Sequence, residues 1–262
     1  MLVNRYPVVY NLVEEDFSLT ANIVPIAMRK GGNELLVQLM SKQTSRHIIN
    51  LLDFPRIGEE TYVVEMEPPA EDGSQRGRFK VGQGEGKEVF PFVIPSEKRA
   101  VITLGEEDKP LFTERLSEEP DLSVSLVIPF ESEIGLEEEL PWSEVAPIEE
   151  VNVASLAEKA SAYATAMNSG DIGRVEREMG VSWKLAEKAG EMSFAQRKGG
   201  IARFFSTGVP LNAVSKVKQV TLFPGSPVVA IENQQIEMTR QGRKVYPRLY
   251  LYYKGGSWVI LK

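Results

Sequence analysis

Residue types that carry most enzyme chemistry are scarce in this chain. Its 262 residues include no cysteine and a single histidine, His47. This composition excludes disulfides, thiol nucleophiles and cysteine-containing zinc sites, and it leaves His47 as the only possible base of a catalytic triad. His47 lies in the apolar segment Arg46–Leu51, where no Asp, Glu or histidine stands two positions away from it. We therefore interpret His47 as a structural residue and expect no metal site.

A second candidate for chemistry is the glycine-rich segment Gly82–Lys87. Its G-x-G-x-G spacing is partly that of a dinucleotide-binding loop, but such a loop must lead into the N-terminus of a helix. Here the following residues, Glu88–Val93, read as a strand. The segment is therefore predicted to be a hairpin loop, and no cofactor is expected.

The charge of the chain divides near residue 150. Residues 1–150 carry 14 Lys and Arg against 29 Asp and Glu, a net charge of −15, whereas residues 151–262 carry 16 against 8, a net charge of +8. The sequence pattern changes at the same place, from short strand-like runs to helices followed by strands. Together these changes indicate two domains, an acidic one followed by a basic one.

Residues 1–130 are predicted to form an all-β domain, either a sandwich or a barrel. Runs rich in Val, Ile, Phe and Tyr recur about every ten residues between Gly, Pro and Asp clusters. The triplet Gly31–Asn33 between two apolar runs indicates a hairpin turn, because glycine tolerates positive φ. The predicted strands are Val8–Val13, Ser18–Ala27, Glu34–Met40, Arg46–Leu51, Thr61–Met66, Arg78–Val81, Glu88–Val93, Ala100–Leu104, Leu111–Arg115 and Leu122–Phe130.

Residues 131–150 are predicted to form an acidic linker between the two domains. The segment contains two prolines and Trp142 among its many glutamates. This composition is typical of a solvated spacer. The alternative is a strap that lies on the basic face of the second domain, with Trp142 as its apolar anchor.

Residues 151–262 are predicted to form an α+β domain in which helices come first and four strands follow. Ser155-x-x-Glu158 matches a capping box for the first helix, Asp171 is placed to cap the second, and Gly180 is expected to end that second helix. Further helices are predicted over Ser182–Ala189 and from Ser193 toward Phe204. The predicted strands are Lys216–Phe223, Val228–Met238, Lys244–Tyr253 and Ser257–Lys262.

Two stretches of this region resemble the NTF2-like, or SnoaL-like, superfamily. Ala157–Asp171 (AEKASAYATAMNSGD) resembles its first helix, which commonly ends in a small-residue turn followed by Asp. Arg248–Ile260 (RLYLYYKGGSWVI) looks like its closing hairpin, with a glycine-rich turn before a tryptophan. The resemblance covers about 110 residues. It implies a cone-shaped α+β fold in which a bent sheet wraps a helix and can leave a pocket at the open end.

The resemblance also implies where a base would lie. Enzymes of this superfamily usually place an Asp or a histidine inside the cone, and the only Asp after residue 150 is Asp171. We interpret Asp171 as a helix cap, worth about 0.5–2 kcal/mol. Strand alternation places Glu232 on the solvent side, opposite Val229 and Ile231. The remaining candidates for a catalytic carboxylate are thus Asp171, Glu232 and Glu237.

Aromatic residues in the same region are candidates for a ligand pocket. Tyr250 and Tyr252 alternate with Leu249 and Leu251 and share a face with Arg248. That face is predicted to line a cavity or form a homodimer surface, or else to pack between strands. Trp183 and Trp258 are expected in the core. The candidate pocket residues are Tyr163, Trp183, Arg248, Tyr250, Tyr252 and Trp258.

Several partners are disfavoured by composition. No apolar run approaches the ~20 residues that cross a bilayer, and Met1–Val13 lacks the continuous apolar region of a secretory signal. We therefore expect a soluble protein, cytoplasmic or exported after removal of its signal. The basic residues after position 150 are spread over several elements, and the acidic half would repel phosphates, which argues against nucleic acid. Docking of the basic domain on the acidic one is the simpler interpretation.

These observations favour a non-enzymatic binding or assembly protein. Its C-terminal cone would bind a small apolar ligand or a protein partner. The alternative is an NTF2-like enzyme, of the isomerase, dehydratase or cyclase type, that acts on a small hydrophobic substrate by carboxylate acid–base chemistry.

Overall fold

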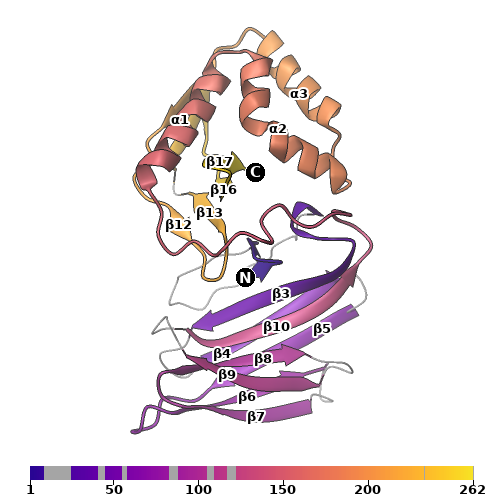
Figure 1. The fold of residues 1–262 in the computed structure, drawn as a ribbon, viewed down its shortest axis with the longest axis vertical. Helices are drawn as coiled ribbons and strands as arrows, with labels where there is room; N and C mark the ends of the chain where they lie inside the picture. Colours follow the sequence, from indigo (N-terminus) through magenta and orange to yellow (C-terminus); the bar gives the residue numbers. More distant parts are fainter. Residues whose placement is uncertain are drawn as a thin grey trace. The chain divides into compact units, whose positions relative to one another are not determined.

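The computed structural model contains two compact units (Figure 1). Unit 1 comprises the described residues of 1–4 and 30–133, and unit 2 comprises those of 5–8, 15–29 and 134–262. The structure describes residues 1–8, 25–40, 45–54, 58–82, 88–104, 109–116, 122–232 and 234–261. Most of two predicted strands, Val8–Val13 and Ser18–Ala27, therefore lies outside the described residues, and Pro25–Ala27 forms a short 3-10 helix, η1.

Unit 1 is built from two β-sheets that lie one behind the other (Figure 1). In the first sheet β1, β3, β10, β8 and β9 are neighbours in that order, and in the second sheet the order is β4, β5, β6, β7. Strand β10 is antiparallel to β3 and parallel to β8. The strands are β1 (Leu2–Val3), β3 (Gly31–Met40), β4 (Ser45–Phe54), β5 (Gly58–Met66), β6 (Gln75–Val81), β7 (Glu88–Ile94), β8 (Lys98–Leu104), β9 (Pro110–Leu116) and β10 (Leu122–Ser132).

Alternating burial explains why these residues form a layered sheet structure. In β6 the side chains of Gln75, Phe79 and Val81 are buried, whereas the intervening arginines are exposed. The ring of Phe92 on β7 stacks on Phe112 of β9 at a centroid distance of 5.6 Å, which joins the two sheets. Separate sheets joined in this way are the arrangement of a sandwich rather than of a closed barrel.

The predicted hairpin at Gly31–Asn33 is wrong. These residues begin β3, where Gly31, Gly32 and Asn33 are opposite Ser132, Glu131 and Phe130 of β10. The long partner strand extends the pairing through the glycines. The buried Asn33 side chain supports this by donating to the carbonyl oxygen of Gly31, at 2.7 Å.

Unit 2 has helices followed by strands, as the sequence predicts. The strands that follow its helices form two sheets, β11-β14-β15 and β12-β13-β16-β17. In the part of the chain that the structure describes, no helix is long and apolar enough to span a membrane. The elements are β2 (Tyr6–Pro7), η1, α1 (Val153–Asn168), α2 (Ile172–Lys188), α3 (Phe194–Ser206), β11 (Asn212–Ser215), β12 (Thr221–Leu222), β13 (Val228–Ile231), β14 (Ile236–Arg240), β15 (Arg243–Val245), β16 (Leu249–Lys254) and β17 (Ser257–Ile260).

Two of the predicted caps are confirmed. Asp171 caps α2 and accepts the backbone N–H of Gly173 at 2.8 Å. Ser193 and Gln196 form a reciprocal capping box at the start of α3. The predicted capping box at Ser155 is wrong, because α1 begins earlier and Asn152 is its cap.

Helix α2 continues through Gly180, where the sequence predicted an end. A glycine within a helix costs about 1 kcal/mol relative to alanine. The buried stripe of Val175, Trp183 and Ala186 extends across the glycine. Burial of such a stripe contributes more than the glycine costs, at about 1.5–3 kcal/mol for a large apolar side chain.

Two of the predicted strands of unit 2 are interrupted, and a third, Lys216–Phe223, shortens to β12 (Thr221–Leu222). Val228–Met238 divides into β13 and β14, and Lys244–Tyr253 divides into β15 and β16 around Pro247. Pro247 has no N–H to donate, so the interruption follows from the residue itself. The interruptions give two short sheets in place of one continuous sheet.

The segment predicted as an acidic linker packs on unit 2 as a strap, with Trp142 as its apolar anchor. Residues 134–150 belong to unit 2, where the Trp142 side chain is 0% exposed. Its ring packs against Tyr6 and Tyr252, at centroid distances of 5.4 and 6.2 Å. Leu136 and Leu140 are also buried. Burial of these apolar side chains holds the segment in place, although its net charge suggested a solvated spacer.

The strap also changes the charge of the second unit. It carries six glutamates and no Lys or Arg, so residues 134–262 have a net charge of +2 instead of the +8 of residues 151–262. Two of its glutamates pair with exposed cations, Glu138 with Lys188 at 2.8 Å and Glu139 with Arg29 at 2.9 Å. The positive charge expected to attract the acidic half is therefore largely offset within unit 2.

Truncation of Trp142 tests this correction. We expect Trp142→Ala to lower the free energy of unfolding of unit 2 by about 3–5 kcal/mol, because a large buried ring is replaced by a cavity. Ellipticity at 222 nm in a urea titration monitors this unit, since the described α-helices all belong to it. Ile134→Ala is the control: its side chain is 51% exposed, and a change within about 0.5 kcal/mol is expected. Equal effects of the two substitutions would contradict the strap.

Candidate functional site

The space between the helices and the sheet of unit 2 is filled with side chains. Three of the predicted pocket residues, Tyr163, Trp183 and Trp258, are buried here in one apolar cluster. Burial raises the pKa of Tyr163 to about 12. Other members of the cluster are Leu156, Val175, Val229, Ile231, Leu249, Leu251 and Ile260. The place where a cone-shaped fold would have its cavity is thus apolar core.

The other predicted pocket residues lie on the opposite face of the sheet. Tyr252 packs against Trp142, and Tyr250 packs against Tyr6 with ring centroids 5.6 Å apart. Burial raises the pKa of both Tyr250 and Tyr252. The chain's own strap and N-terminal segment therefore cover the face on which a ligand or a second copy was predicted to bind.

Arg248 and Glu232 meet at the end of this sheet. The Arg248 guanidinium is exposed and lies 3.8 Å from the Glu232 carboxylate, whose side chain is only 10% exposed. Thr221 also donates to Glu232, at 3.4 Å. Glu232 was predicted to face solvent, but its side chain is mostly buried beneath Thr221 of the neighbouring strand and Arg248.

The other two catalytic candidates have structural partners at separate places. Asp171 is an exposed helix cap, and Arg174 lies 3.7 Å from its carboxylate. Glu237 accepts hydrogen bonds from Lys244 and Thr239, and these bonds lower its pKa. Asp171 caps α2, Glu232 directly follows β13, and Glu237 lies within β14. The structure therefore does not bring the three carboxylates together. Within the described ranges, no three Asp, Glu or histidine side chains gather as metal ligands would.

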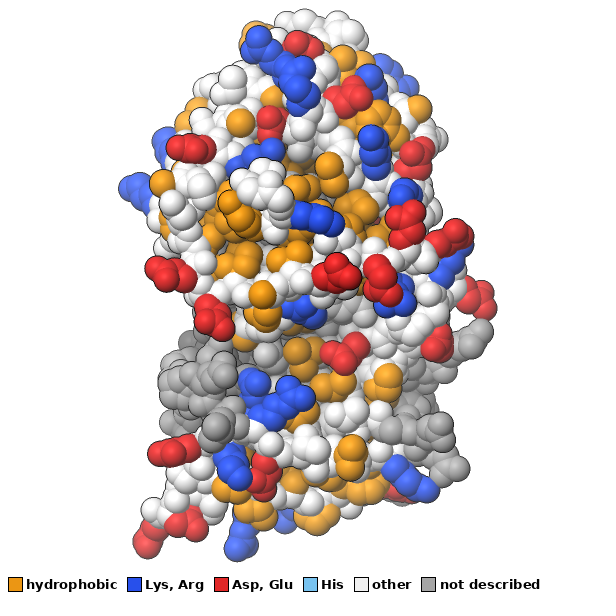
Figure 2. Space-filling model, in the orientation of Figure 1, with side chains coloured by type: hydrophobic (Ala, Val, Ile, Leu, Met, Phe, Trp, Pro, Cys, Tyr) orange, Lys and Arg blue, Asp and Glu red, His pale blue; other side chains and the backbone are white. Residues whose placement is uncertain are grey.

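Two shallow recesses adjoin along helix α1 in unit 2, with volumes of about 710 and 290 Å³, and they share Ala162 and Glu178. We call them the two parts of the α1 groove. Hydrophobic side chains gather between α1 and α2 on the face seen in Figure 2, with charged side chains around them. The larger part is lined by Ile148, Glu150, Val151, Asn152, Ser155, Glu158, Lys159, Ala162, Glu178, Tyr253, Gly256, Ser257 and Trp258.

An aromatic pair forms one wall of the larger part. Tyr253, 46% exposed, meets Trp258 edge to face at a centroid distance of 5.1 Å. The Trp258 indole N–H donates to Ser155 Oγ at 2.9 Å, and this hydroxyl donates to the carbonyl oxygen of Asn152 at 2.8 Å. The first turn of α1 therefore orients the indole, and its exposed neighbour Tyr253 offers an apolar face to a ligand.

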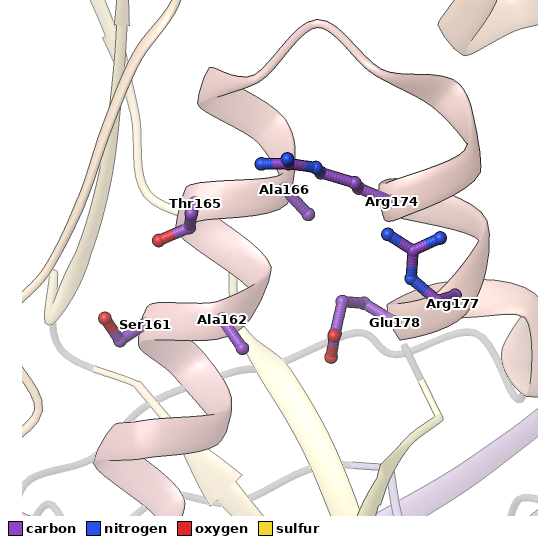
Figure 3. A pocket seen from close by; sticks show the side chains of 7 residues that line it. All are labelled: Ser161, Ala162, Thr165, Ala166, Arg174, Arg177 and Glu178. Carbon is purple, nitrogen blue, oxygen red and sulfur yellow. The ribbon is translucent and has the colours of Figure 1, made fainter.

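Charged residues divide the groove. Lys159 of α1 and Glu178 of α2 form a 2.7 Å ion pair where its two parts meet, and both side chains are largely buried. Glu150 and Glu158 line the larger part, whereas Arg174 and Arg177 line the smaller part. Figure 3 shows Arg174 and Glu178 extending from α2 toward α1, where Ala162 and Ala166 face them, with Arg177 closer to α2. The small side chains on α1 leave room for the arginines.

Sequence reasoning found Trp258 but missed most of this groove. A signal for Tyr253 was available: the strand period places it with Leu249 and Leu251 on the helix side of β16, at the end nearest the Gly255–Gly256 turn. No comparable signal marks Glu158, Arg174 or Arg177. They come together only because α1 and α2 pack side by side.

The pKa of Tyr163 provides a test of the filled interior. Its folded pKa of about 12 exceeds the ordinary value of 10, so the unfolded chain loses this proton first as the pH rises. Stability is therefore full below pH 10 and falls between about pH 10 and 12, by roughly 2–3 kcal/mol from this group. Comparison of denaturation midpoints with Tyr163→Phe isolates the contribution. An identical pH dependence in both proteins would indicate a hydrated cavity around Tyr163.

Asp171 is tested as a cap by two substitutions. Asp171→Ala is expected to destabilise the protein by about 0.5–2 kcal/mol, because the N–H of Gly173 loses its acceptor. Asp171→Asn keeps an acceptor and is expected to retain most of that stability. Thermal unfolding followed at 222 nm distinguishes the two. Equal losses for both would show that the negative charge, rather than the cap geometry, matters.

Comparison of the chain with protein-family models, with curated proteins and with solved structures gives no match.

Proposed function

We propose that this chain is a non-enzymatic binding or assembly protein whose binding site is the α1 groove of unit 2. The observation that carries the proposal is the half-exposed Tyr253, held against an oriented Trp258 in a recess of about 710 Å³. Recesses of this size that combine apolar and aromatic walls with a few charged groups are typical of ligand sites. The groove takes the place of the interior cone pocket that the sequence suggested.

The proposal keeps the NTF2-like resemblance for the C-terminal region. The order of α1, α2 and α3 followed by antiparallel strands supports it, as does the closing hairpin of β16 and β17 with its glycine turn. A fold of this type serves many functions, so the site must decide between them. Here the space between the helices and the sheet is core, which leaves the outer groove for binding.

A polypeptide segment fits the groove better than a small apolar molecule. The lining mixes apolar side chains such as Val151 and Tyr253 with charged ones such as Glu158 and Lys159. Such a mixture resembles the edge of a protein interface more than a closed apolar pocket. The carboxylates considered for catalysis are outside the groove, and each has a structural partner.

Selection of displayed random peptides on the full chain tests the proposal. Ala162 lines both parts of the groove and is exposed, so Ala162→Trp should fill the groove without disturbing the core. We expect the selected peptides to lose at least about tenfold in affinity for Ala162→Trp. The control is Ala202→Trp, at an exposed position of α3 that does not line the groove.

Two outcomes would contradict the proposal. One is a selection that yields no binding peptide. The other is a set of peptides that bind the wild type, Ala162→Trp and Ala202→Trp equally well, since such peptides would bind outside the groove.

A further inference from the structure

We propose that the α1 groove recognises a short extended peptide segment that carries a basic and an acidic residue about four positions apart. The inference rests on the proposed binding function and adds the chemistry of the partner. It is carried by the opposite charges that line the two adjoining parts of the groove.

One end of the groove attracts a cation. Glu150 and Glu158 line it, and neither carboxylate has an ion-pair partner among the residues that the structure describes. Tyr253, which is 46% exposed, lines the same part of the groove. Two carboxylates and an exposed aromatic ring in one recess suit a Lys or Arg side chain, which gains charge attraction from the first and cation–π contact from the second.

The other end attracts an anion. The guanidinium of Arg177 has no ion-pair partner in the described part of the chain, and that of Arg174 has only the 3.7 Å contact with Asp171. Both line this part of the groove, where Arg174 extends toward α1 and Arg177 stays closer to α2 (Figure 3). Two adjacent guanidinium groups favour a carboxylate, which each can bind through a pair of N–H donors.

The middle of the groove is already neutral. The ion pair of Lys159 with Glu178 lies between the two ends, and Ala162 beside it contributes only a methyl group. A partner needs no charge here, and small or apolar side chains fit this section. A partner that fits all three sections therefore carries a basic residue, then small or apolar residues, then an acidic residue.

Helix geometry sets the spacing of the two charges. Glu158 marks the acidic end and Ala166, which faces the arginines, marks the other, so the two ends are eight residues apart on α1. At a rise of 1.5 Å per residue this is about 12 Å. An extended peptide advances about 3.3 Å per residue, so about four residues span the same length.

Partners with charge of one sign fit this groove poorly. A nucleic acid or an anionic lipid surface would gain from Arg174 and Arg177 but would be repelled by Glu150 and Glu158. A segment with both charges satisfies both ends. The two charges can be matched with the peptide running in either N-to-C direction, so both directions are tested.

The indole N–H resonances of the full chain provide a local measurement. The protein has three tryptophans; Trp258 lines the groove, whereas Trp142 and Trp183 are buried and do not line it. We would titrate in the peptides Ac-KFGAE-NH2 and Ac-EAGFK-NH2, with Ac-QFGAQ-NH2 as the neutral control. At least one of the two charged peptides should shift the Trp258 resonance and leave the other two in place. Its affinity should exceed that of the neutral peptide by about tenfold at low salt.

Charge reversal makes the assignment specific. Arg177→Glu is expected to weaken binding of the charged peptide about tenfold and to favour Ac-KFGAK-NH2 instead. The matched control is Arg203→Glu, an equal change of charge at an exposed position of α3 outside the groove, which should leave affinity unchanged.

The outcomes separate this inference from the proposed function. If the neutral peptide binds as well as the charged ones, or if Arg177→Glu has no more effect than Arg203→Glu, the charge pattern is wrong while groove binding stands. The charge pattern is also wrong if none of these peptides moves the Trp258 resonance although peptides sensitive to Ala162→Trp have been selected. If no peptide of any kind is sensitive to Ala162→Trp, the proposed function fails as well.

Discussion

Burial of Trp142 is the interaction on which the rest of unit 2 depends. The ring lies between Tyr6 and Tyr252 and carries the strap onto the outer face of the sheet that contains β13 and β16. The other face of that sheet packs against the helices through residues such as Val229 and Leu251. Because both faces are covered, all four residues of β13 are buried. A strand of this kind is apolar throughout, as Val228–Ile231 is.

A sheet covered on both faces leaves its surfaces unavailable for ligands. Tyr250 and Tyr252 pack under the chain's own segments, and Tyr163 and Trp183 are part of the core on the helix side. Among the described aromatic residues of this sheet, Tyr253 at the hairpin of β16 and β17 remains exposed, at 46%. This constraint explains why the candidate site lies at an edge, beside α1, and why the residues first considered for a pocket are mainly structural.

The groove owes its charge pattern to the packing of two helices. Lys159 and Glu178 bridge α1 and α2 with both side chains largely buried, so their partnership is less screened by water than that of the surface pairs. Glu158 is next to Lys159 on α1, and Arg174 is one turn before Glu178 on α2; the first lines the larger part of the groove and the second the smaller part. The pattern requires no special loop, only two helices in contact at one register.

Local rules determined much of this protein from the sequence alone. Most described strands of unit 1, the cap at Asp171 and the helix that starts at Ser193 follow from side-chain period and capping chemistry, which act within a few residues. Tertiary structure decided what depends on distant partners. Trp142 is an anchor because Tyr6 and Tyr252 meet it, and Gly31–Asn33 continue a strand because β10 pairs with them. The groove likewise forms from residues more than a hundred positions apart, such as Ser155 and Trp258. Composition and local spacing do not predict such contacts, because packing and burial in the folded chain determine which distant residues meet.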